Sequence, residues 1–112
     1  MNYMGSSKTT FFSDEQNQIA VWLKALAHPA RVAIIQHLLK TDSCMGVELF
    51  NKLPLAQATI SQHLKELKAA DIIKGDVEGV KVNYCINATT WAVMKKELSF
   101  LLESYTPKNN CC

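Results

Sequence analysis

The sequence is poor in the features that mark several other classes of protein. It holds 112 residues, enough for one domain, and none of its apolar runs approaches the roughly 20 residues that a membrane-spanning helix needs. Its four glycines leave little room for a Gly-rich phosphate loop. We find neither a Ser/His/Asp set nor clustered carboxylates. These shortages exclude a membrane span and argue against an enzyme.

Arginine is almost absent. Arg31 is the one arginine among twelve basic residues, so the side chain most often used for bidentate contacts to guanine is scarce. The formal net charge of +2 is mild, and such a charge permits DNA binding without requiring it. The first ten residues lack the charged and apolar regions of a signal peptide, so we expect a cytoplasmic chain.

One stretch, residues 53–70, carries the strongest functional pattern. Ile60, Leu64 and Leu67 recur at spacings of four and three, as on one face of an amphipathic helix. The other face is predicted to carry Gln57, Thr59, Ser61, Gln62, His63, Lys65 and Lys68. Groups of these types hydrogen-bond base edges and phosphates, and an α-helix fits the major groove of DNA. A solvated polar face is the alternative.

Three helices are predicted before this stretch. Ser13 and Gln16 form a capping box at the start of the first helix. Pro29 breaks that helix and begins the second. A turn then leads to a short third helix that Ser43 would cap and that carries the apolar residues of 47–53. A short helix, a turn and a polar-faced helix make a helix-turn-helix.

A β-hairpin and a last helix are predicted after the polar helix. Asp71 is expected to take a left-handed exit from it. Residues 72–77 form a first strand, residues 78–79 a turn, and residues 80–87 a second strand with alternating apolar and polar side chains. The last helix, over residues 91–105, is more apolar than one thin domain needs, so part of it should contact another subunit.

The predicted fold is therefore mainly α with a small β-hairpin wing, a winged helix-turn-helix in the order ααααββα. The predicted domain covers residues 13–105. Residues 1–12 form a flexible N-terminal tail, and residues 106–112 form a flexible tail that contains cysteine.

The strings LKALAHPARVAIIQHL, ATISQHLKEL and VKVNYCIN resemble the ArsR family of winged-helix repressors. The resemblance covers residues 13–105 and includes an "LAHPxR" turn, an "SxHLxxL" helix and a "GxxxxY" wing in the right order. It implies a homodimer built on the first and last helices, operator binding by the fourth helix and the wing, and release by a small effector.

The resemblance also assigns residues to these roles. The DNA-facing positions are Gln57, Thr59, Ser61, Gln62, His63 and Lys65 on the helix, with Lys74 and Lys81 on the wing. His28 matches a position at a helix start, where a structural role is expected. The dimer interface is predicted to hold Ile19, Trp22, Leu23, Trp91, Met94, Leu98, Leu101 and Leu102.

The four cysteines match no zinc-finger spacing and are expected to be reduced thiols in a cytoplasmic chain. The family's thiolate pattern at the third helix is displaced here, with Cys44 one position off, and no histidine follows His63 to build a site on the last helix. Cys44, Cys111 and Cys112 remain as ligands for arsenite or another thiophilic metal ion.

Other interpretations of the cysteines stay open. In the first, Cys44 is a small buried residue and the tail thiols have no function. In the second, the tail thiols respond to oxidation. In the third, the repressor has no effector. Cys85 is expected on the non-core face of its strand, as a surface thiol.

The sequence thus favours a dimeric, sequence-specific repressor whose two polar helices enter successive major grooves ~34 Å apart on a palindromic operator. The alternative is a winged-helix dimer that does not bind DNA and acts as a protein interaction module. Residues 52–81 support the alternative, because five lysines against four acidic residues leave a net charge of only +1.

Overall fold

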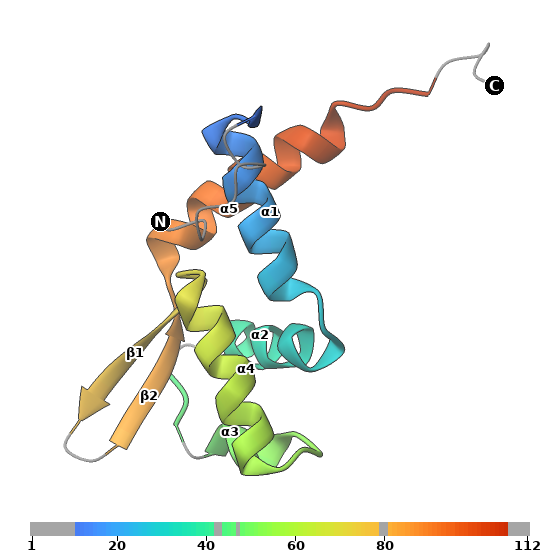
Figure 1. The fold of residues 1–112 in the computed structure, drawn as a ribbon. Helices are drawn as coiled ribbons and strands as arrows, with labels where there is room; N and C mark the ends of the chain where they lie inside the picture. The colour runs from blue at the N-terminus through green and yellow to red at the C-terminus, as the bar shows by residue number, and fades with distance from the viewer. Residues whose placement is uncertain (1–10, 42–43, 47, 79–80, 108–112) are drawn as a thin grey trace.

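Helices and strands follow one another in the predicted order (Figure 1). The structure, a computed structural model, describes residues 11–41, 44–46, 48–78 and 81–107. The elements are α1 (Asp14–Leu26), α2 (Pro29–Lys40), α3 (Glu48–Lys52), α4 (Gln57–Ala69), β1 (Ile73–Glu78), β2 (Lys81–Ile86) and α5 (Ala88–Glu103). The prediction of a mainly α fold with a β-hairpin wing is confirmed. Within the described ranges, no helix has both the length and the apolar character to cross a membrane.

Local signals set the starts of the first two helices. The Gln16 N–H donates to Ser13 Oγ at 3.1 Å and the Ser13 N–H donates to Gln16 Oε1 at 2.9 Å, so the predicted capping box is confirmed. His28 is the N-cap of α2, where its Nδ1 accepts from the Ala30 N–H at 3.0 Å. Pro29 follows at the first position, since its missing N–H costs a helix nothing there.

The exit from α4 is a Schellman motif, which the sequence predicted in part. Asp71 has φ 61°, the left-handed conformation expected of it. The Ile72 N–H donates to the Leu67 oxygen at 3.2 Å and the Asp71 N–H donates to the Lys68 oxygen at 2.9 Å. Leu67 and Ile72 are fully buried, so this turn fixes the angle between α4 and the wing.

The wing is an antiparallel pair whose register runs from Ile73 opposite Ile86 to Glu78 opposite Lys81. An isolated β-bridge joins Met45 to this wing, because the Met45 N–H donates to the Tyr84 oxygen at 2.9 Å and the Tyr84 N–H donates to the Met45 oxygen at 2.7 Å. This bridge was not predicted. Helix α3 begins only at Glu48, and Ser43 lies outside the described residues.

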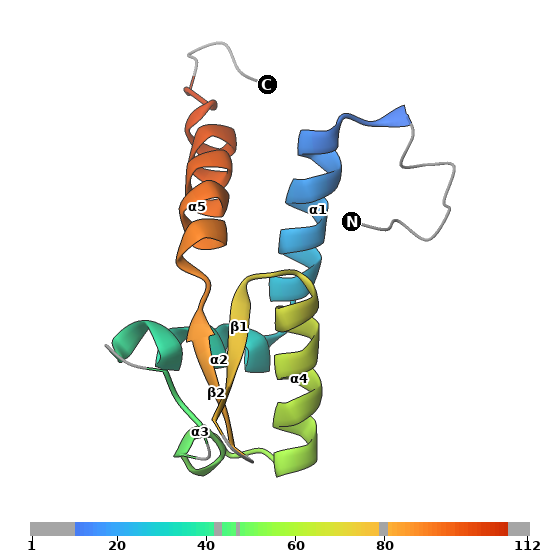
Figure 2. The same ribbon diagram turned by 90° about the vertical axis from the view of Figure 1, so that its left-hand side faces the viewer.

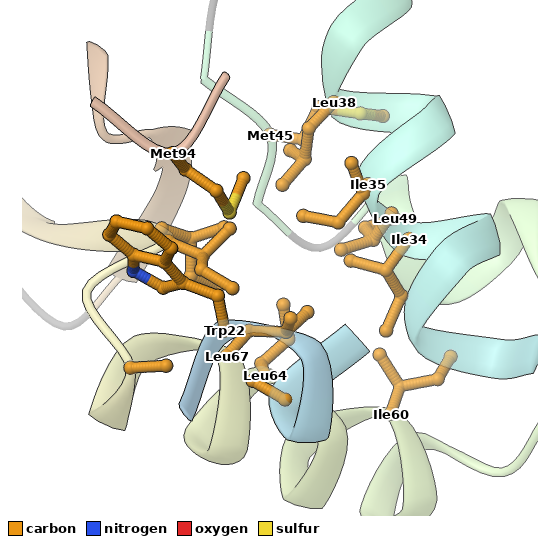
Figure 3. Close-up of a cluster of buried hydrophobic side chains, with 14 residues drawn as sticks. Trp22, Ile34, Ile35, Leu38, Met45, Leu49, Ile60, Leu64, Leu67 and Met94 are labelled. Carbon is orange, nitrogen blue, oxygen red and sulfur yellow. The ribbon is translucent and has the colours of Figure 1, made fainter. Parts of the chain in front are cut away.

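One apolar cluster joins the helices (Figure 3). Its fully buried side chains come from α2, α3, α4 and the start of the wing: Ile34, Leu49, Ile60, Leu64, Leu67, Ile72 and Ile73. Helices α1 and α5 extend from one end of this core, whereas α3, α4 and the wing occupy the other end (Figures 1 and 2). The core therefore separates the end of the molecule with α1 and α5 from the end with α3, α4 and the wing.

Candidate nucleic-acid interface

Helix α4 presents a polar face to solvent. Its spacing of apolar residues places Ile60, Leu64 and Leu67 in the core. The side chains on the outer face are exposed: Gln57, Thr59, Ser61, Gln62 and Lys65. Ala56, the N-cap, has no side-chain acceptor for the first backbone N–H groups of the helix. These N–H groups carry the positive end of the helix dipole and suit an anion such as a phosphate.

The wing continues this surface beside α4. Lys74 is exposed on β1. The Lys68 ammonium lies 3.5 Å from the point where a Cβ on Gly75 would stand, so a basic side chain reaches from α4 onto the wing. Lys81 begins β2 opposite Glu78, and its side chain lies outside what the structure describes.

His63 does not lie on the exposed face, and the structure corrects that prediction. It is only 9% exposed, its Nδ1 accepts from Arg31 Nε at 3.1 Å, and its ring lies 4.4 Å from that of His28. The spacing already contained the reason, since His63 follows Ile60 by three residues and therefore shares the core side of α4. Its role is to position α4 against the rest of the domain.

Arg31 is a positioning residue that the sequence did not reveal. Its Nη1 donates to the Ala25 oxygen at 3.1 Å, and to the Lys24 oxygen at 3.5 Å, at the C-terminal end of α1. Through Nε it also holds His63 on α4. The chain's one arginine is therefore engaged inside the domain, where it links α1, α2 and α4.

The structure also corrects the predictions for two cysteines. Cys44 and Cys85 are joined in a disulfide, so they are neither reduced thiols nor, for Cys85, an isolated surface thiol. A disulfide sulfur carries no thiolate charge, and Cys44 in this state is no ligand for arsenite or a thiophilic metal ion. Cys111 and Cys112 lie outside the described residues. Among the residues that are described, no group of three His, Cys, Asp or Glu side chains could hold a metal ion.

Comparisons with known proteins agree with this arrangement. A helix-turn-helix domain model matches residues 26–76. The transcriptional regulator Rv2034 of Mycobacterium tuberculosis is 33% identical over 75 residues, which are 67% of this chain and 69% of that protein. The chain belongs to the ArsR family of winged helix-turn-helix transcriptional regulators. This is a family of regulators and not of enzymes.

Two further relatives show how far the similarity extends. The transcriptional repressor SmtB of Mycobacterium tuberculosis is 44% identical over 62 residues, but these are 55% of this chain and only 45% of that repressor. An ArsR-like regulator from Rhodococcus sp. RHA1 superposes with a TM-score of 0.68 over 82% of this chain and 86% of that one, at 17% identity. The second likeness shows the fold alone.

Apolar side chains gather at the end of this ArsR-family chain opposite α4. Phe100, Leu101 and Leu102 follow one another near the C-terminal end of α5, and all three are exposed. Helix α5 extends beyond the core there (Figures 1 and 2). Other exposed apolar side chains on α1 and α5 or beside them are Phe11, Phe12, Leu23, Val93 and Tyr105. A group of exposed apolar side chains of this kind is typical of a surface that contacts another protein.

Some residues predicted for a dimer interface belong instead to the chain's own core. Trp22 and Met94 are 4% and 3% exposed, so they have almost no surface left to give to a partner. Of the remaining predicted residues, Leu23, Leu101 and Leu102 are exposed and Ile19, Trp91 and Leu98 are half-buried.

Acidification is expected to destabilise this ArsR-family domain through His63. Burial, and then the charges of His28 and Arg31, lower the pKa of His63 below its usual 6.5, against a smaller opposing effect of Glu66. The unfolded chain therefore binds a proton that the folded chain resists, and the free energy of unfolding should fall as the pH drops below about 6.5. Urea unfolding at about pH 7.5 and about pH 5.5 measures this difference.

A pair of glutamine variants compares His63 with His37. His63→Gln should flatten the dependence on pH, because the amide accepts a hydrogen bond but does not titrate. His37→Gln, on the half-buried side of α2, should leave that dependence as in the wild type. An unchanged pH dependence in His63→Gln would show that this histidine is not the titrating group.

Proposed function

We propose that the protein is a homodimeric repressor that binds a palindromic DNA operator. The observation that carries the proposal is the row of exposed amide, hydroxyl and ammonium groups on α4, at the end of the molecule away from α1 and α5. Membership of a family of helix-turn-helix regulators supports it. Since the match covers 45% of SmtB, the activity of the whole protein is part of the proposal.

The proposed contacts divide between bases and phosphates. Gln57, Thr59, Ser61 and Gln62 have the hydrogen-bonding groups that read base edges in the major groove. Lys65, with Lys74 and Lys81 from the wing and the first N–H groups of α4, has the charge to bind the flanking phosphates. His63 is left out, because it is buried against Arg31.

The proposed dimer uses the apolar side chains of α1 and α5. A second copy that covers Leu101, Leu102 and Leu23 would remove these groups from water, and closed two-fold pairing is the commonest way to do so. Two-fold symmetry then sets two α4 helices to meet successive major grooves, ~34 Å apart. This spacing predicts inverted half-sites about one helical turn apart.

The recognition face is tested on DNA that the wild-type protein selects from a random pool. Gln62→Ala should weaken binding to the selected site by about 5- to 150-fold, as expected for loss of a base contact, and should relax the base preference at one position. Lys65→Ala should weaken all sequences alike and reduce the salt dependence by about one counterion. Fluorescence anisotropy over a series of salt concentrations measures the affinity of each variant and its salt dependence.

Matched controls come from the exposed side of α2. Gln36→Ala and Lys40→Ala remove the same groups from exposed positions outside the helix-turn-helix, and both should bind as the wild type does. Selection that enriches no inverted repeat would favour the protein interaction module over the repressor. Wild-type affinity in both Gln62→Ala and Lys65→Ala would remove α4 from the interface.

A further inference from the structure

We propose that Cys44 and Cys85 form a reversible dithiol–disulfide couple that fixes the wing to the helix-turn-helix unit, and that the disulfide form binds DNA more tightly. The effect on DNA rests on the proposed function. The site differs from the thiolate site expected from the sequence, because it uses neither tail cysteine and it binds no metal ion. It is a modification site for a small oxidant such as a peroxide.

The backbone holds the two cysteines in register. The paired hydrogen bonds between Met45 and Tyr84 make these residues a hydrogen-bonded antiparallel pair. Cys44 and Cys85 are therefore the next opposed pair along the bridge, the non-hydrogen-bonded position at which Cα atoms approach to about 4.5 Å. Their Cα atoms are 4.5 Å apart, within the range that a disulfide spans. Backbone pairing, rather than the sulfur bond alone, thus keeps the dithiol ready to close.

The surroundings allow exchange with small molecules. Both cysteines are half-buried, so a small oxidant or reductant can approach them. Lys74 is exposed and lies directly opposite Cys85 in the register of the wing. An ammonium group at a neighbouring cross-strand position favours the thiolate form of a reduced cysteine, which is the reactive form.

The bond closes a loop around the proposed DNA-binding unit. The two cysteines are 41 residues apart, and α3, α4 and β1 lie wholly between them. Every residue proposed to contact DNA therefore lies inside the loop. Without the bond, the segment before α3 is joined to β2 through the two bridge hydrogen bonds and side-chain packing. The closed loop restricts the conformations of the wing before DNA binds. Binding then costs less conformational entropy.

The chemistry balances with a peroxide as the oxidant. One thiolate attacks a peroxide oxygen, the O–O bond breaks, and a sulfenic acid forms as hydroxide leaves and takes up a proton. The second thiol attacks the sulfenic sulfur, the S–S bond forms, and the S–O bond breaks with loss of a second water. Two electrons pass from the sulfurs to the peroxide. A small dithiol reverses the change by thiol–disulfide exchange and is itself oxidised to a disulfide.

The test uses the full chain with Cys111→Ser and Cys112→Ser, so that Cys44 and Cys85 are its two remaining cysteines. Peroxide should lower its mass by two hydrogens and link the Cys44 and Cys85 peptides, and dithiothreitol should reverse both changes. The oxidised form should melt about 10 °C or more above the reduced form. It should bind the selected operator on the order of tenfold more tightly.

Two single variants provide the controls. Cys44→Ser and Cys85→Ser, in the same background, should bind DNA as the reduced form does. Peroxide should leave their affinity unchanged, because the one remaining thiol can form a sulfenic acid but cannot link residues 44 and 85. Failure of peroxide to link the two peptides, or equal operator affinity in the two redox states, would overturn the couple while leaving the repressor in place. Tighter binding by the reduced form would overturn the proposed direction. If the disulfide forms and neither state binds any selected DNA, the proposed function fails, and the effect on DNA fails with it.

Discussion

Leu102→Asp is expected to convert the proposed dimer into monomers and to weaken operator binding by at least about 100-fold. Leu102 is 75% exposed in the single chain, so a carboxylate there should not disturb the isolated fold. In a dimer the same carboxylate would be buried without a partner, and burying an unpaired charge is costly. A monomer loses the second half-site, and with it the 10²–10⁴-fold gain that linked binding usually brings.

Sedimentation analysis and operator titration of the same samples measure the two effects together. Leu39→Asp is the matched control, because Leu39 is an exposed leucine on α2, outside the two helices that are proposed to form the dimer. It should stay dimeric and bind as the wild type does. A Leu102→Asp protein that remains a dimer with wild-type affinity would place the interface elsewhere, and one that is monomeric with full affinity would reject the paired half-sites.

Features that depend on near neighbours in the chain were predictable. The capping box of Ser13 and Gln16, the start of α2 at Pro29 and the left-handed Asp71 all arise from interactions within five residues. The core side of α4 followed from the period of its apolar residues. The same period places His63 on the core side, which the prediction of a DNA-facing His63 left out.

Features that join distant segments could not be predicted. Nothing in the alternation of β2 indicates that Met45 pairs with Tyr84, because the two residues lie far apart in sequence and the partner segment is very short. Without that bridge, the sequence indicates a surface thiol at Cys85 and leaves Cys44 as a candidate metal ligand. Likewise, the apolar stripes of α1 and α5 do not tell whether Trp22 and Met94 face their own chain or a partner.

The arrangement explains how α4 is held without using its polar face. Leu64 packs in the central cluster, and Arg31 anchors His63 one residue earlier on the helix. Both anchors lie on the core side, whereas the amides and hydroxyls of the outer face are exposed to solvent. Substitutions on the two sides of α4 should therefore have different effects. Changes on the outer face should alter DNA binding, and changes on the core side should alter stability.

Leu64→Ala is expected to lower the free energy of unfolding by about 2–5 kcal/mol, a large part of the roughly 5–15 kcal/mol that keeps a typical domain folded. Leu64 is 1% exposed, and the truncation leaves a cavity beneath α4 that rigid neighbours fill only in part. Leu39→Ala removes the same atoms from a side chain that is 51% exposed, and it should change stability by no more than about 0.5 kcal/mol.

Urea unfolding at one fixed protomer concentration compares the two leucine variants, because the stability of a dimer depends on concentration. At temperatures where Leu64→Ala is still folded, its outer face is unchanged, so its operator affinity should stay within a few-fold of the wild type. Equal losses of stability in the two variants would show that α4 is not seated on the core through Leu64. A large loss of affinity in folded Leu64→Ala would show that the core side sets the angle at which α4 meets DNA.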